Sequence, residues 1–130
     1  MNWKLILQLS MFGLVMGLAT VFVIPSKIEP LFWLVIFVVC AHVIAKQTSK
    51  PFLHGLCLGL ANCVWITGAH VLLFHQYIAT HAQEAQMMQS MPASPRIMMA
   101  IVGPVVGLVS GVVIGLFSLL ASKLVKPAVA

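Results

Sequence analysis

Four long runs of apolar residues, separated by short polar stretches, limit what this chain can fold into. Each run approaches the length of a transmembrane α-helix, which needs about 20 apolar residues. Hydrophobic residues make up 62% of the chain and charged residues only 7%, whereas roughly a quarter of an average soluble domain is charged. A soluble fold of 130 residues has too little interior to bury so much apolar surface. The sequence therefore predicts an all-α integral membrane protein whose main partner is the lipid bilayer.

The polar stretches predict where four helices begin and end within a single domain, 1–130. Pro25 ends the first apolar run, and Glu29 with Pro30 opens the second. A carboxylate suits the positive N-terminal end of a helix, and proline suits its first turn. The fold class that follows is a membrane four-helix bundle with a polar, partly helical outer segment at about 76–96. The four helices are expected at about 5–24, 31–45, 52–75 and 97–121.

Basic residues beside the apolar runs predict the orientation in the membrane, because cytoplasmic loops have an excess of Lys and Arg. Five such residues lie on the side of the two termini: Lys4, Lys46, Lys50, Lys123 and Lys126. The other side has only two, Lys27 and Arg96. We therefore expect both termini in the cytoplasm and the polar segment outside, in a bacterial inner membrane. Because these residues mark helix ends and form no patch, we expect no nucleic-acid partner.

Glycines at four-residue spacing form the strongest motif in the chain. Such glycines lie on one stripe of a helix, where another backbone can approach closely, and close packing drives helix association in lipid. The partner could be another helix of the same bundle, a second copy in a homo-oligomer, or a larger membrane complex. The motif consists of Gly103, Gly107, Gly111 and Gly115 in the fourth predicted helix, Gly55 and Gly59 in the third, and Gly13 and Gly17 in the first.

Polar residues share one broad arc of the third predicted helix. With about 100° of rotation per residue, Asn62, Thr67 and His70 fall on this arc. One alternative is a packed face, on which the Asn62 amide bonds Gln8, Ser10 or a second copy and so fixes the helix register. The other is a face along a solute path. No Asp, Glu, Lys or Arg lies inside a predicted span, so the usual acidic residue of a cation-coupled antiporter is missing.

Histidine and methionine gather in and around the polar outer segment. Imidazole and thioether are soft ligands that suit copper, and His75, His81 and Met88 are the candidates for such a site. Their spacing matches no specific ligand motif, and methionine is also a common apolar filler. Copper binding is therefore the third of three functional hypotheses.

The sequence contains no recognisable catalytic constellation. Paired carboxylates, a P-loop, a nucleophile elbow and zinc-type Cys/His spacing are all missing. We expect neither an enzyme nor a cofactor. The leading hypothesis is a structural, accessory or assembly role through glycine-mediated helix packing. The alternative is an oligomeric small-solute channel or transporter whose path Asn62, Thr67 and His70 face.

Overall fold

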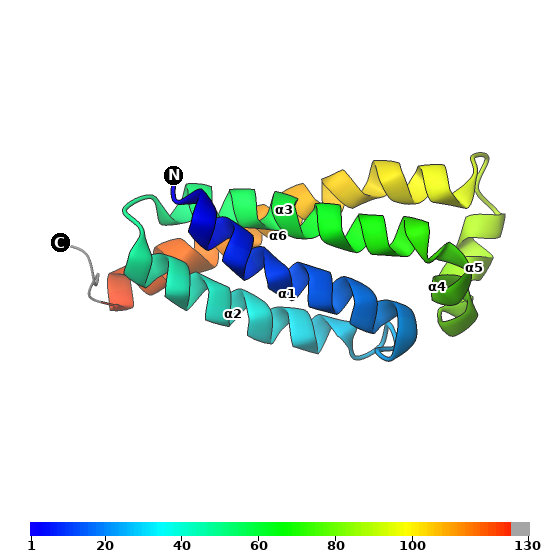
Figure 1. Ribbon diagram of the computed structural model, residues 1–130, viewed down its shortest axis with the longest axis horizontal. Coiled ribbons are helices and arrows are strands. Elements are labelled where there is room, and N and C mark those ends of the chain that lie inside the picture. Colours follow the sequence, from blue (N-terminus) through cyan, green and yellow to red (C-terminus); the bar gives the residue numbers. More distant parts are fainter. Residues whose placement is uncertain (126–130) are drawn as a thin grey trace.

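The computed structural model describes residues 1–125 and is helical throughout, with no strand in that part of the chain. Four of its helices are long and apolar enough to cross a membrane, which confirms the all-helical prediction with four candidate spans. They are α1 (Trp3–Phe22), α2 (Glu29–Gln47), α3 (Pro51–Leu72) and α6 (Pro95–Leu124) (Figure 1). Two short helices connect α3 to α6, namely α4 (Phe74–Thr80) and α5 (Ala82–Gln89).

The helix bounds differ from the predicted ones mainly around the outer segment. The third helix ends at Leu72, before the predicted residue 75, and α4 begins directly after Leu73. The last helix begins at Pro95 and is 30 residues long, which exceeds the length that hydrocarbon alone requires. Lys126, one of the residues behind the predicted orientation, lies outside the described residues.

The four long helices run alternately up and down along one axis (Figure 1). The N-terminus, the turn between α2 and α3 and the end of α6 lie together at what we call the terminal end. The loop between α1 and α2 lies with α4 and α5 at the opposite end, which we call the loop end. Helix α3 packs closely against α6 and α1, and α2 packs mainly against α6. Helices α1 and α2 touch little, although they are consecutive.

Helix α2 packs closely against the other helices near the terminal end. Cys40, Ala41, Ile44 and Ala45 are 0 to 2% exposed. Two of them join a core cluster to which every long helix contributes, consisting of Leu5, Leu9, Cys40, Ile44, Leu58 and Ile114. Toward the loop end, α2 instead presents the bulky side chains of Trp33 and Phe37, and the space beside them stays open.

The glycine stripes of α3 and α6 face each other inside the chain. A Cβ on Gly59 would overlap backbone atoms of Gly111, and a Cβ on Gly55 would lie 2.5 Å from the backbone nitrogen of Gly115. The other glycines of the motif also face α3: Gly13 faces Asn62, Gly17 faces Ile66, Gly103 faces Thr67 and Gly107 faces Cys63. Each glycine of the motif therefore has a packing partner within one chain.

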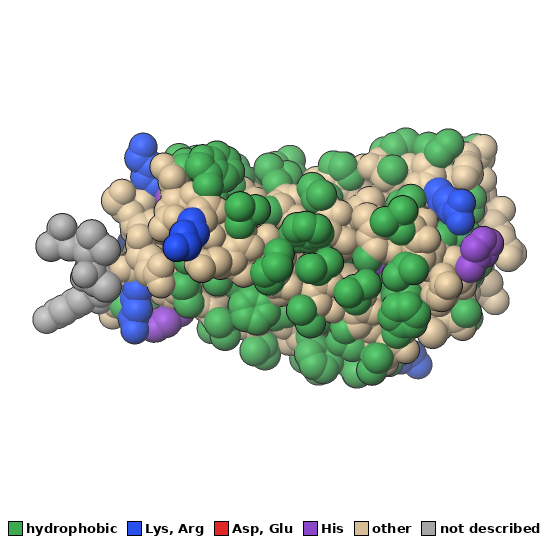
Figure 2. Space-filling model, in the orientation of Figure 1, with side chains coloured by type: hydrophobic (Ala, Val, Ile, Leu, Met, Phe, Trp, Pro, Cys, Tyr) green, Lys and Arg blue, Asp and Glu red, His purple; other side chains and the backbone are tan. Residues whose placement is uncertain are grey.

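Hydrophobic side chains cover the length of the bundle between its two ends. Figure 2 shows them along the drawn face, with Lys, Arg and His side chains toward the ends. Large apolar residues of α2, including Leu31, Val35 and Val38, are more than half exposed. A membrane-spanning surface is expected to look like this, because lipid covers it and the helices satisfy their own backbone groups.

Candidate functional site

A cavity of about 820 Å³ lies between α2, α3 and α6, with residues of α4 and α5 at its loop end. Its volume falls in the range of small-molecule pockets, roughly 300 to 1,000 Å³. Most lining side chains are apolar, among them Leu34, Phe37, Val106 and Phe117. Helix α1 contributes none of the described lining residues. The cavity is therefore an apolar compartment with few polar groups, as in typical ligand sites.

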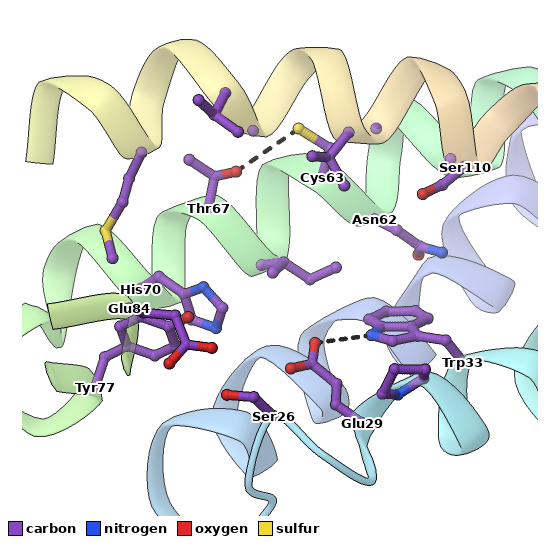
Figure 3. A pocket seen from close by; sticks show the side chains of 18 of the residues that line it. Ser26, Glu29, Trp33, Asn62, Cys63, Thr67, His70, Tyr77, Glu84 and Ser110 are labelled. Atoms are coloured by element: carbon purple, nitrogen blue, oxygen red, sulfur yellow. Dashed lines mark hydrogen bonds between the residues drawn. The ribbon is translucent and has the colours of Figure 1, made fainter. Parts of the chain in front are cut away.

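The three polar residues predicted on one arc of the third helix all line this cavity. Figure 3 shows Asn62, Thr67 and His70 along α3 at the edge of this space, with Thr67 against α6 and the Asn62 amide toward α1. Thr67 lies with its hydroxyl 3.7 Å from the sulfur of Cys63. The Nε2 atom of His70 lies 2.8 Å from the hydroxyl of Thr20, so His70 also links α3 to α1.

Asn62 has the most unusual environment in the site. Its side chain is 4% exposed, and neither Oδ1 nor Nδ2 has a hydrogen-bond partner within residues 1–125. The expected bond to Ser10 does not form, because the Ser10 hydroxyl donates to the carbonyl of Leu7 and accepts a bond from the Trp65 indole at 3.1 Å. Asn62 instead lies against Gly13 of α1 and on the cavity wall. Buried amide groups are nearly always hydrogen-bonded, so this one calls for an explanation.

Both acidic residues of the chain line the cavity, and the sequence analysis did not assign them to the site. Glu29 begins α2, and its Oε1 accepts a hydrogen bond from the Trp33 indole at 3.0 Å (Figure 3). Glu84 belongs to the first turn of α5. None of the described lining residues is Lys or Arg. In the sequence, Glu29 looks like a helix-start residue and Glu84 like part of a polar connection. The signal that could have found them is that they are the only two acids.

Tyr77 lies close enough to both carboxylates for their charges to affect its pKa. Burial raises its pKa to about 12, with further contributions from the negative charges of Glu84 and Glu29. Burial by itself would raise the pKa of Glu84, but the Ser26 hydroxyl, a backbone hydrogen bond and the nearby His81 lower it below its ordinary value. Glu84 is therefore ionised at neutral pH, so it brings a negative charge to the loop end of the cavity.

A stack of three rings positions the short helices over the loop end. The ring centroids of His70 and Tyr77 lie 4.2 Å apart, and those of Tyr77 and His81 are separated by the same distance. His81 is 2% exposed, and its Nδ1 lies 3.0 Å from the carbonyl oxygen of Tyr77. The Thr80 hydroxyl donates to the carbonyl of Val21 at 3.1 Å. These contacts fix α4 and the start of α5 against α1 and α3.

The three copper candidates do not come together in this fold. Met88 lines the cavity, whereas His75 is exposed and His81 is buried in the ring stack. Within residues 1–125, no group of three or more His, Cys, Asp or Glu residues could hold a metal ion. Met91, Met98 and Met99 join Met88 in the lining, where methionine provides soft and adaptable apolar surface.

Comparison of this chain with protein-family models, with curated proteins and with solved structures finds no match in any of the three.

Proposed function

We propose that this chain binds a small, largely apolar solute in the membrane, as the solute site of a channel or transporter formed by α2, α3 and α6. The cavity itself supports this proposal most directly, because about 820 Å³ of mostly apolar space lies between three helices long and apolar enough to cross a membrane. Its volume is typical of small-molecule sites.

The packing of the glycine motif gives little support to an assembly role. Each glycine of the motif already packs within the chain, and the tightest contacts join Gly59 to Gly111 and Gly55 to Gly115. A second copy or a larger complex would have to use another surface. Oligomerisation stays a prediction, and each subunit of an oligomer would then have its own cavity.

We also propose a bacterial inner membrane with both termini in the cytoplasm. The support is the group of basic residues at the terminal end, Lys4, Lys46, Lys50 and Lys123. The loop end of the cavity would then face away from the cytoplasm. A reporter enzyme that is active only outside the cytoplasm tests this when it is inserted after Gln89 or fused to the C-terminus. We expect activity only from the first position.

Protection of a cysteine tests the solute site in the unmodified protein. Cys63 lines the cavity. Cys57, which precedes it on the same helix α3, is partly exposed but does not line the cavity. In lipid nanodiscs, N-ethylmaleimide should label Cys63, and the neutral aromatic probe N-phenyl-1-naphthylamine should slow that labelling severalfold. Labelling of Cys57, followed by mass spectrometry in the same sample, should not change. A Cys63 that reacts freely at every concentration of the probe would overturn the proposal.

A pair of matched substitutions locates the site more narrowly. Trp33→Leu removes an aromatic side chain from the cavity wall, and we expect it to weaken protection of Cys63 severalfold. Trp3→Leu makes the same chemical change at an exposed position of α1 that does not line the cavity, and it should leave protection intact. Equal protection in both variants would remove Trp33 from the site.

A further inference from the structure

The charges of this chain are distributed unevenly with respect to the cavity. Seven Lys and Arg residues stand against two acidic residues in the whole sequence, for a formal net charge of +5. Nevertheless both acids, Glu29 and Glu84, line the cavity, and no Lys or Arg does so within the described residues. The charge of the cavity lining is therefore opposite in sign to the net charge of the protein. Two helices far apart in sequence supply the acids, so local sequence composition does not explain this.

Aromatic side chains surround the two carboxylates. The indole of Trp33 is held by Glu29, and the Tyr77 ring lies between the rings of His70 and His81. Figure 3 shows Glu84 and Tyr77 together at one side of the cavity with Ser26 near Glu84, and it shows Glu29 and Trp33 across the space. Electron-rich ring faces attract cations, with Trp the most effective. Carboxylates next to aromatic rings are thus a binding environment for an organic cation.

The apolar part of the cavity determines the chemical character of the rest of the ligand. Beyond the carboxylates, the lining continues over Leu34, Val102, Val106, Val113 and Phe117. A hydrated inorganic ion would leave this surface without a partner, whereas an amphiphilic molecule covers it.

We infer that the cavity binds a lipophilic organic cation, with its cationic centre between Glu29 and Glu84 and its apolar body toward Phe117. This inference rests on the proposed function, since it assigns a chemical class to the solute of the same cavity. The Trp33 ring beside Glu29 flanks the cationic centre, whereas both faces of Tyr77 are covered by His70 and His81.

Three probes of one shape test the inference. Tetraphenylphosphonium, tetraphenylsilane and tetraphenylborate each place four phenyl rings around one atom and differ in charge, being positive, neutral and negative. Their ability to slow labelling of Cys63 would be measured in nanodiscs of zwitterionic lipid, and probe uptake by empty nanodiscs would be subtracted. We expect tetraphenylphosphonium to protect at the lowest bound concentration and tetraphenylborate not to protect.

Substitution of the carboxylates gives the more specific result. We expect Glu84→Gln to weaken protection by tetraphenylphosphonium about tenfold, which corresponds to the loss of one charged contact. Protection by neutral tetraphenylsilane should not change. Gln89→Lys is the matched control, because it alters the net charge by the same amount on the same helix α5, at an exposed position outside the cavity. This variant should keep tight binding of the cation. Glu29→Gln provides an independent second test.

The possible outcomes separate the inference from the proposed function. If the neutral probe protects Cys63 as well as the cation does, and Glu84→Gln has no effect, the cavity binds solutes without selecting cations and the inference is overturned. If Gln89→Lys weakens binding as much as Glu84→Gln, the effect is one of surface charge and the inference is again overturned. If neither these probes nor N-phenyl-1-naphthylamine protects Cys63, the proposed function is lost together with the inference.

Discussion

The two halves of this bundle are built from the same four helices, yet one half is closed and the other is hollow. At the terminal end, Leu58 of α3 and Ile114 of α6 are completely buried beside Cys40 and Ile44 of α2. From the loop end, the same three helices enclose a cavity of about 820 Å³ that reaches along α6 as far as Phe117. Because α3 and α6 remain in contact through their glycines in both halves, the difference lies in α2. Its buried residues Cys40 and Ile44 pack against the other helices near the terminal end, whereas Trp33 and Phe37 line the open space.

Buried polar groups differ between the halves in the same way. His54, near the terminal end, is 4% exposed and uses both ring nitrogens: Nε2 accepts a bond from the backbone N–H of Asn2 at 2.9 Å, and Nδ1 lies 2.8 Å from the carbonyl oxygen of Lys50. Asn62, on the cavity wall, is equally buried and has no such partner within the described residues. His54 is thus satisfied within the fold, whereas Asn62 and the Nε2 atom of His81 have no hydrogen-bond partner within residues 1–125.

The largest expected effect comes from separating α3 and α6. Gly59→Ala places a Cβ onto backbone atoms of Gly111, and backbone cannot move aside as a flexible side chain can. We expect the free energy of unfolding to fall by about 3 kcal/mol. Thermal unfolding in mild detergent, followed by circular dichroism, measures this. The cavity should be lost in the same variant, because α6 forms one of its walls.

Gly68→Ala is the control within the same helix. A Cβ at Gly68 meets nothing within 4 Å, so the substitution adds helix propensity without a clash. We expect it to raise stability by up to about 1 kcal/mol. Equal destabilisation by both substitutions would mean that close contact between α3 and α6 is not what the glycines provide.

A smaller effect should distinguish the polar groups of the two halves. His54→Leu leaves the N–H of Asn2 and the carbonyl of Lys50 without their partner, and we expect it to lower the free energy of unfolding by about 2 kcal/mol. Asn62→Leu removes a buried amide that has no partner, and we expect it to raise the free energy of unfolding by about 1 to 3 kcal/mol. The same detergent unfolding assay compares the two. A loss of stability in Asn62→Leu would show that its amide is paired within the fold.

The sequence predicts the helices well because a lipid environment imposes a single requirement on the backbone. A run of about 20 apolar residues must become a helix to satisfy its backbone groups, and proline and charged residues mark where the runs end. The four candidate spans were therefore predictable, as was the grouping of Asn62, Thr67 and His70 on one face of α3. These features depend only on distances along one helix.

The rest of the site depends on how helices meet, which short-range patterns do not specify. Glu84 reaches the cavity only because α5 folds back over the loop end, and the ring stack of Tyr77 and His81 holds it there. The four-residue glycine spacing in α6 revealed a close contact but not its partner, since a second copy would satisfy the same pattern. Likewise, the spacing of His75 and His81 gave no sign that one is exposed and the other buried.

The smallest expected effect concerns the negative charges at the loop end of the cavity. Tyr77 is the only tyrosine of the chain, so the absorbance change of its phenol can be followed without interference. Because burial and then the charges of Glu84 and Glu29 raise its pKa to about 12, the folded protein should titrate near that value. The unfolded protein should titrate near the ordinary value of about 10. The neutral phenol is therefore favoured by folding, and this contribution to stability is complete below about pH 10 and lost as the pH rises toward 12.

The two carboxylates should influence this titration in a fixed order. Glu84→Gln should lower the pKa of Tyr77 more than Glu29→Gln does, because Glu84 is the stronger of the two charge contributions and burial, the largest cause, is unchanged in both variants. A folded protein whose tyrosine titrates near 10 would mean that water reaches Tyr77 and that α4 and α5 do not close over the loop end. A raised pKa that neither substitution lowers would mean that burial alone causes it. The hollow half would then differ from the closed half in shape but not in charge.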